Sequence, residues 1–168
     1  EFAGRVASVG TRVSSVAPGD EVMGIVGGGS YASQLVTHER LLLPVPGGVP
    51  LADAAAIPEV FITAFDALVL QGGLTAGRWA LVHGGASGVG TAAIQLVRAV
   101  GASSIVTTST AKVERCARLG ADVVVDYTTE DFVAVSKGTT AGRGVDVVLD
   151  MVGGSYLPRN VSAAAAQG

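Results

Sequence analysis

The sequence predicts an α/β protein in which a doubly wound parallel sheet follows a smaller β-rich region. Three observations predict this class. Short apolar runs alternate with helical runs after about residue 51, a glycine-rich loop separates the first such strand from the first long helix, and residues 1–50 hold short β-compatible runs. Strands this apolar are typical of parallel sheets whose two faces are both covered by helices.

Residues 1–50 are expected to form short strands separated by turns. The β-compatible runs are "GRVASVG", "DEVMGIV" and "YASQLVTH", and they are divided by Pro18-Gly19-Asp20 and by Gly27–Gly29. Pro44, Pro46 and Pro50 then indicate a connector, because proline cannot donate to a strand ladder.

From residue 51 onward the pattern changes to alternating helix and strand. Phe61, Ala64, Phe65 and Leu68 share one helix face, and that helix is expected to end near Gly72-Gly73. Apolar strand candidates follow at 80–82, 105–107, 123–125 and 145–149, separated by helical runs near 88–100, 110–119 and 129–136. The chain starts without Met and stops after the helix-like run "SAAAAQG". We therefore expect a fragment whose sheet lacks its last strands.

Composition excludes several classes of protein. The chain is 49% hydrophobic and 15% charged, and its net charge of −3 with scattered basic residues offers no footprint for nucleic acid. A single cysteine, Cys116, excludes an internal disulfide and a zinc site of several thiolates, so no metal site is predicted. No leader-like start or membrane-length apolar run is visible, which predicts a cytoplasmic protein without a membrane partner.

The loop "HGGASGVG" follows the first apolar strand and opens a helix. A pyrophosphate needs a tight turn, close backbone N–H groups and the positive end of a helix, and Gly85, Gly88 and Gly90 remove the side chains that would hold it away. Ser87 stands where the strict G-x-G-x-x-G pattern has glycine, but serine is small and a good N-cap. The loop therefore predicts a Rossmann-like dinucleotide site. A structural turn with glycines for close packing is the alternative.

The end of the second apolar strand indicates which nucleotide would bind. In NAD sites an Asp or Glu about 20 residues beyond the loop binds the ribose hydroxyl. The stretch "SSIVTTSTAK" has hydroxyls there and no carboxylate, and it ends in Lys112. Hydroxyls with a cation suit a phosphate dianion, so the sequence favours NADP(H) over NAD. An ordinary Ser/Thr helix start with a solvated lysine is the alternative.

With these motifs the chain resembles the medium-chain dehydrogenase/reductase superfamily, in its zinc-free quinone oxidoreductase branch. "EFAGRVASVG" and "PGDEVMGIV" are similar to its GroES-like catalytic domain, and "ADAAAIPEVFITAFDAL" to the helix pair before its cofactor domain. "GASGVGTAAIQLVRAVGA" and "LDMVGGSY" resemble the p53-inducible subgroup, in which serine also stands mid-loop. The resemblance implies a partial GroES-like domain over residues 1–50. It implies an NADP(H)-binding Rossmann domain, without its C-terminal strands, over residues 51–168.

The resemblance also implies roles for individual residues. Gly88, Val89 and Gly90 would pack on the pyrophosphate, with Gly85 and Ser87 completing the loop. The other implied contacts are Ser109, Lys112 and Tyr127 at the 2′-phosphate, and Thr63, Val152, Gly153 and Gly154 near the nicotinamide. A plain structural role remains the alternative for Tyr127, and a helix-packing hydroxyl for Thr63.

These observations predict an NADPH-dependent reductase that transfers hydride to a quinone or an α,β-unsaturated carbonyl, in a cleft between two domains, without metal or covalent intermediate. We name no catalytic residue: His83 is interpreted as a strand-end residue that shapes the loop, and Cys116 as a bystander. An enoyl reductase module of a polyketide or fatty-acid synthase is one alternative, and a non-catalytic NADPH-binding sensor or structural protein is another. A homodimer is possible for the full-length protein.

Overall fold

The computed structural model describes residues 1–166, which form two compact units that meet between Ile62 and Thr63. This division falls inside helix α2 (Pro58–Phe65), later than the residue-50 boundary drawn from the sequence. The backbone N–H of Glu59 donates to the Glu1 carboxylate at 3.0 Å, which ties the start of α2 to the first unit. The GroES-like assignment of residues 1–50 stays a prediction.

The first unit is built on a small antiparallel sheet with the order β1-β2-β3. Phe2, Val22 and Met23 are its buried apolar side chains. Its elements are β1 (Phe2–Arg5), β2 (Glu21–Gly24), the 3₁₀ helix η1 (Glu39–Leu41), β3 (Leu42–Pro44) and α1 (Leu51–Ala54).

Two expectations for the first unit were wrong. The run "YASQLVTH" is not a strand: the side chains of Tyr31 and Val36 are fully exposed, so they provide no apolar face to pack on the sheet. The third strand is instead Leu42–Pro44, which none of the β-compatible runs predicted and which ends at the first proline of the expected connector. Pro44 is tolerated because it ends an edge strand, where a missing N–H costs no ladder bond.

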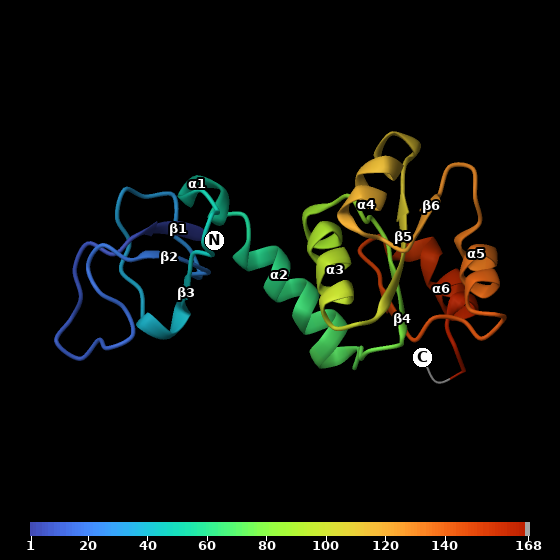
Figure 1. The fold of residues 1–168 in the computed structure, drawn as a ribbon, viewed down its shortest axis with the longest axis horizontal. Coiled ribbons are helices and arrows are strands. Elements are labelled where there is room, and N and C mark those ends of the chain that lie inside the picture. Colours follow the sequence, from blue (N-terminus) through green and yellow to red (C-terminus); the bar gives the residue numbers. More distant parts are fainter. Residues whose placement is uncertain (167–168) are drawn as a thin grey trace. The chain divides into compact units, whose positions relative to one another are not determined.

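The second unit is a four-stranded parallel sheet with the order β6-β5-β4-β7, which confirms the predicted fold class. Helices α3 and α4 lie on one face of this sheet, and α5 and α6 on the other (Figure 1). The strands are β4 (Trp79–Val82), β5 (Ser103–Thr108), β6 (Val123–Asp126) and β7 (Val147–Leu149). The helices are η2 (Asp66–Gln71), α3 (Gly88–Ala99), η3 (Thr110–Lys112), α4 (Val113–Leu119), α5 (Phe132–Thr139), η4 (Gly154–Tyr156) and α6 (Leu157–Ala163).

Besides the buried apolar side chains of α3, this unit has an apolar cluster between the sheet and helices α5 and α6. The buried members of this cluster are Leu81, Ile105, Val125, Phe132, Val145 and Ala163.

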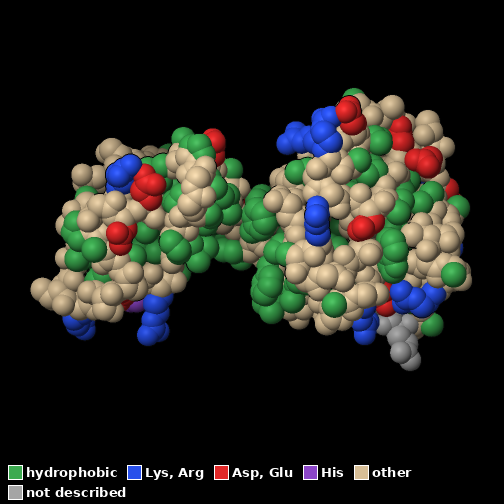
Figure 2. Space-filling view, viewed as in Figure 1, with side chains coloured by type: hydrophobic (Ala, Val, Ile, Leu, Met, Phe, Trp, Pro, Cys, Tyr) green, Lys and Arg blue, Asp and Glu red, His purple; other side chains and the backbone are tan. Residues whose placement is uncertain are grey.

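On the surface, Figure 2 shows basic side chains dispersed over the visible face, with acidic ones among them. Within residues 1–166 no helix is long and apolar enough to span a bilayer.

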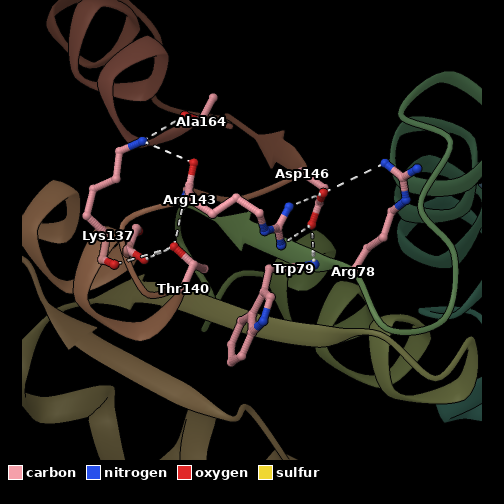
Figure 3. Close-up of polar contacts among 9 residues, drawn as sticks. Arg78, Trp79, Lys137, Thr140, Arg143, Asp146 and Ala164 are labelled. Atoms are coloured by element: carbon pink, nitrogen blue, oxygen red, sulfur yellow. Dashed lines mark hydrogen bonds and ion pairs between the residues drawn. The ribbon is translucent and has the colours of Figure 1, made fainter. Parts of the chain in front are cut away.

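Asp146, just before β7, joins the beginnings of two neighbouring strands (Figure 3). Its carboxylate accepts the backbone N–H of Trp79, the first residue of β4, at 2.8 Å, and the guanidinium of Arg143 at 2.6 and 3.0 Å. Arg78 approaches to 3.7 Å. The Arg143 hydrogen bonds are the main reason that the pKa of Asp146 lies below its ordinary value.

We expect Asp146→Asn to lower the free energy of unfolding by about 2 kcal/mol at pH 7, because charge-assisted bonds to a nearly buried group are lost. A lowered folded-state pKa stabilises the fold above the unfolded value of about 3.9 and stops doing so as the pH falls through the folded value. The gap between wild type and variant in urea unfolding should therefore shrink between pH 7 and pH 3. An equal gap at both pH values would contradict the prediction.

Candidate nucleotide-binding site

The four parallel strands end at the same edge of the sheet, and eleven of the twelve predicted cofactor residues lie at that edge. Ligands of open α/β sheets bind outside the carboxyl ends of the strands. The loop after β4 holds Gly85, Ser87, Gly88, Val89 and Gly90, and the turn after β5 leads to Ser109 and Lys112. Tyr127 follows β6, and Val152, Gly153 and Gly154 follow β7. Thr63 lies on α2 and is half-buried.

The loop between β4 and α3 turns tightly and starts the helix as the sequence predicts. Gly84 has φ +69°, a conformation that favours glycine. Ser87 is the N-cap of α3, and its Oγ accepts the backbone N–H of Gly90 at 3.0 Å. The serine that departs from the strict glycine pattern therefore has a capping role.

Gly85 and Gly90 are required by the packing of the protein on itself. A Cβ at Gly85 would lie 2.8 Å from Cβ of Val106 on β5. A Cβ at Gly90 would collide with the carbonyl oxygen of Gly84 and lie 2.7 Å from Cα of Gly85. The close-packing interpretation therefore holds for these two glycines, whatever else the loop binds.

The first turn of α3 retains the features that an anion needs. The N–H groups of Gly88 and Val89 find no acceptor among residues 1–166, and Gly88 is exposed. Unpaired N–H groups at the start of a 12-residue helix carry its positive end. These two residues fit a pyrophosphate, and their binding of one stays a prediction.

The turns after β5 and β6 place hydroxyls and a cation on the surface, beside a buried carboxylate at the end of β6 that sequence reasoning missed. Ser109 is the N-cap of the turn η3 and Lys112 is its last residue, and the side chains of Lys112 and Tyr127 are exposed. Asp126 accepts the hydroxyls of Thr110 at 2.5 Å and Thr128 at 2.6 Å. The Thr110 hydroxyl contributes most to holding the pKa of Asp126 below its ordinary value. The acid is thus ionised but engaged by protein hydroxyls.

The segment after β7 is held by Asp150. The backbone N–H groups of Val152 and Gly153 donate to its Oδ1 at 2.8 and 2.9 Å, and Gly153 has φ +67°. Burial raises the pKa of Asp150, but these N–H groups, together with His83 and Asn160, outweigh it and the net pKa is lowered. Both N–H groups are therefore already hydrogen-bonded, so any contact of Val152 and Gly153 with a cofactor would use their other atoms.

A buried polar chain links the ends of three strands, and its members Asn160 and Asp150 were also missed. His83, fully buried after β4, lies 3.0 Å through Nδ1 from Oγ1 of Thr107 on β5. Its Nε2 lies 2.8 Å from Oδ1 of Asn160 on α6. The amide nitrogen of Asn160 donates to Asp150 at 2.8 Å. These contacts agree with the shaping role expected for His83. Asn160 and Asp150 lie far from His83 in the sequence, and no local pattern indicated that the three residues would be linked.

Cys116 is buried on α4, with its Sγ near the Cβ position of Gly85. Burial raises the pKa of its thiol, which makes the thiolate scarce at neutral pH. Within the described residues no three His, Cys, Asp or Glu side chains are placed to share a metal ion.

Known proteins share both the sequence and this fold. Residues 88–168 match the family described as zinc-binding dehydrogenase. The phenolphthiocerol synthesis polyketide synthase type I Pks15/1 of Mycobacterium marinum is 42% identical over 94% of this chain and 8% of its own length. The solved CurK enoyl reductase has a TM-score of 0.90 at 33% identity, over 99% of this chain and 50% of that one.

Two further solved structures resemble the chain. A quinone oxidoreductase of Pseudomonas syringae pv. Tomato DC3000 has a TM-score of 0.83 at 31% identity, over 99% of this chain and 52% of its own. The mycobacterial Rv1454c complexed with NADPH has a TM-score of 0.85 at 30% identity, over 99% of this chain and 53% of its own.

The doubly wound sheet with its glycine loop defines a Rossmann-like domain of the kind that dehydrogenases contain. The family match over residues 88–168 and the similar solved structures support the resemblance to the medium-chain dehydrogenase/reductase superfamily that the motifs indicated. The chain spans about half the length of these solved structures and less than a tenth of the curated relative.

Proposed function

We propose that the chain is the cofactor-binding part of an NADPH-dependent reductase that delivers hydride to a conjugated carbonyl compound. The observation that carries this proposal is the cluster of predicted cofactor residues at one edge of the parallel sheet. They surround the N–H groups of Gly88 and Val89, which have no acceptor within residues 1–166. A bound NADPH would supply the hydride. The protein's part is to bind and orient it: the start of α3 holds the pyrophosphate, and the loops beside it hold the two ends of the dinucleotide.

The preference for NADPH rests on the turn between β5 and α4. Ser109 and Lys112 offer a hydroxyl and a cation to a 2′-phosphate, and the neighbouring carboxylate of Asp126 is already bound by two threonine hydroxyls. Among the similar structures, Rv1454c is described as complexed with NADPH. Tyr127 is half exposed after β6, where its ring could lie along an adenine.

We expect Lys112→Ala to weaken NADPH binding about tenfold or more, since a charged hydrogen bond to phosphate is lost, and to leave NADH binding unchanged. Isothermal titration calorimetry of the purified chain with both cofactors measures this. Fluorescence of Trp79 suits the experiment poorly, because this residue begins β4 and lies at the opposite end of the strand from the loop.

Arg118→Ala is the matched control, since it removes the same charge from an exposed side chain of α4 and loses only the pair with Glu114. Equal loss in both variants would mean that net charge alone governs binding. Equal affinity of the wild type for NADPH and NADH would refute the 2′-phosphate assignment but not the assignment of the glycine loop to the pyrophosphate. If neither cofactor binds, the proposed function fails for this chain.

Quinones and enoyl thioesters are both conjugated carbonyls, and each acceptor class corresponds to one of the similar solved structures, the Pseudomonas quinone oxidoreductase and the CurK enoyl reductase. The enoyl reductase candidate is supported by the 42% identity to a polyketide synthase and the TM-score of 0.90 with the CurK enoyl reductase. The quinone candidate is supported by the Pseudomonas structure and by the "SGVG" loop. Assays of the full-length protein with a simple quinone and an enoyl thioester distinguish them, and cofactor binding without turnover of either favours a sensor or structural role.

A further inference from the structure

The donors and acceptors in the hydrogen-bond chain through His83 can be assigned by starting from Asp150, the residue at its end. Asp150 is ionised and can only accept, so the group of Asn160 that faces it is the amide NH₂, at 2.8 Å. The amide oxygen of Asn160 therefore faces His83, and Nε2 of the ring must carry a proton to donate to it at 2.8 Å. A neutral imidazole is then the Nε2–H tautomer, whose Nδ1 accepts the hydroxyl proton of Thr107 at 3.0 Å.

The surroundings of His83 favour this neutral form. Phe132 and Tyr156 contact the ring edge-to-face, with centroids 4.7 and 4.8 Å away. Burial is the main reason that the pKa of His83 lies below its ordinary value. The hydrogen bond to Asn160 and the charge of Asp150 favour the charged ring, and Arg159 disfavours it, but each effect is smaller than that of burial.

We propose that His83 is a positioning residue: it transmits the geometry of the β5 end through Asn160 to Asp150, and so sets the backbone of Val152 and Gly153. Thr107 also accepts the N–H of Gly84 at 3.4 Å, so the same chain touches the glycine loop. The two loops that would hold opposite ends of the cofactor are thereby tied together inside the protein. The hydrogen bonds of this chain do not depend on any cofactor. Their consequence for cofactor binding rests on the proposed function.

The first test uses the fact that the chain has two histidines. In a His38→Gln background, nitrogen–proton correlation NMR reports which ring nitrogen of His83 carries the proton. We expect Nε2–H from pH 6 to pH 8. A proton on Nδ1, or on both nitrogens, in that range overturns the proposal.

The second test removes the far end of the chain. Thr107→Val takes the hydroxyl from Nδ1 without touching Asp150, and we expect about tenfold faster hydrogen exchange at the amides of Val152 and Gly153. Thr107→Ser keeps the hydroxyl and should restore the wild-type rates. Thr140→Val is the matched control, because Thr140 is also buried and its hydroxyl donates to the Ser136 carbonyl, away from this chain of bonds. Unchanged amides in Thr107→Val overturn the proposal.

The third measurement is NADPH affinity. If the amides respond, Thr107→Val should weaken binding about fivefold and Thr140→Val should not change it. Altered amides with unaltered affinity would overturn the positioning role. A wild-type chain that binds no NADPH would refute the proposed function instead, and the tautomer and exchange results would still decide whether His83 sets the loop.

Discussion

Replacing Gly90 with alanine should be among the most damaging single changes in the chain, with a loss of about 3 kcal/mol in the free energy of unfolding. The added methyl group would meet backbone atoms of Gly84 and Gly85, and backbone cannot move aside as a flexible side chain can. Either α3 shifts away from the loop or the loop opens, and both displace the N–H groups of Gly88 and Val89. Urea unfolding measures the stability, and calorimetry should find NADPH binding lost.

Gly138→Ala is the control for this change. Gly138 lies within α5, its φ is not positive, and a Cβ there would have nothing within 4 Å. Alanine is about 1 kcal/mol better than glycine in a helix interior, so this variant should be neutral or slightly more stable. If Gly90→Ala unfolds at the same urea concentration as the wild type, the close approach of α3 to the loop is not as described.

The parallel sheet could be predicted because its signals are local and strong. The runs that became β4, β5 and β6 are apolar on both faces, and each is followed within a few residues by a helical pattern. The N-cap role of Ser87 was likewise predictable, since the serine immediately precedes the helix it caps. Ends of elements were less certain: β7 begins at Val147, and Val145 makes only an isolated bridge to Ala164.

The polar interior of the site could not be predicted in the same way. His83 and Asn160 are 77 residues apart, and nothing in the periodicity of either segment indicates that they pair. Likewise, no local pattern pairs Asp126, at the end of β6, with the hydroxyl of Thr110, in the turn after β5. Long-range polar pairs depend on the register of the sheet and on which helix covers which face. Sequence patterns constrain these features only after the fold is known.

Phe132→Ala is the second change with a large expected effect, about 4 kcal/mol of unfolding free energy. The ring is 1% exposed at the start of α5, where it packs against His83 and Tyr156, and the guanidinium of Arg159 lies 4.2 Å from its centroid. Its removal leaves a cavity among side chains of the sheet and two helices. Phe65→Ala, at a ring that is 41% exposed, should cost far less and serves as the control.

The same substitution tests why His83 stays neutral. Burial is the largest cause of its lowered pKa, so a cavity that admits water beside the ring should let that pKa rise toward its ordinary value. In the wild type, the lowered pKa destabilises the fold as the pH falls below the unfolded value of about 6.5, where only the unfolded chain gains the proton. That penalty should be smaller in Phe132→Ala, so its stability deficit at pH 8 should exceed its deficit at pH 5.5. An equal deficit at both pH values, with an unmoved His83 titration, would mean that the Phe132 ring does not shield the imidazole from water.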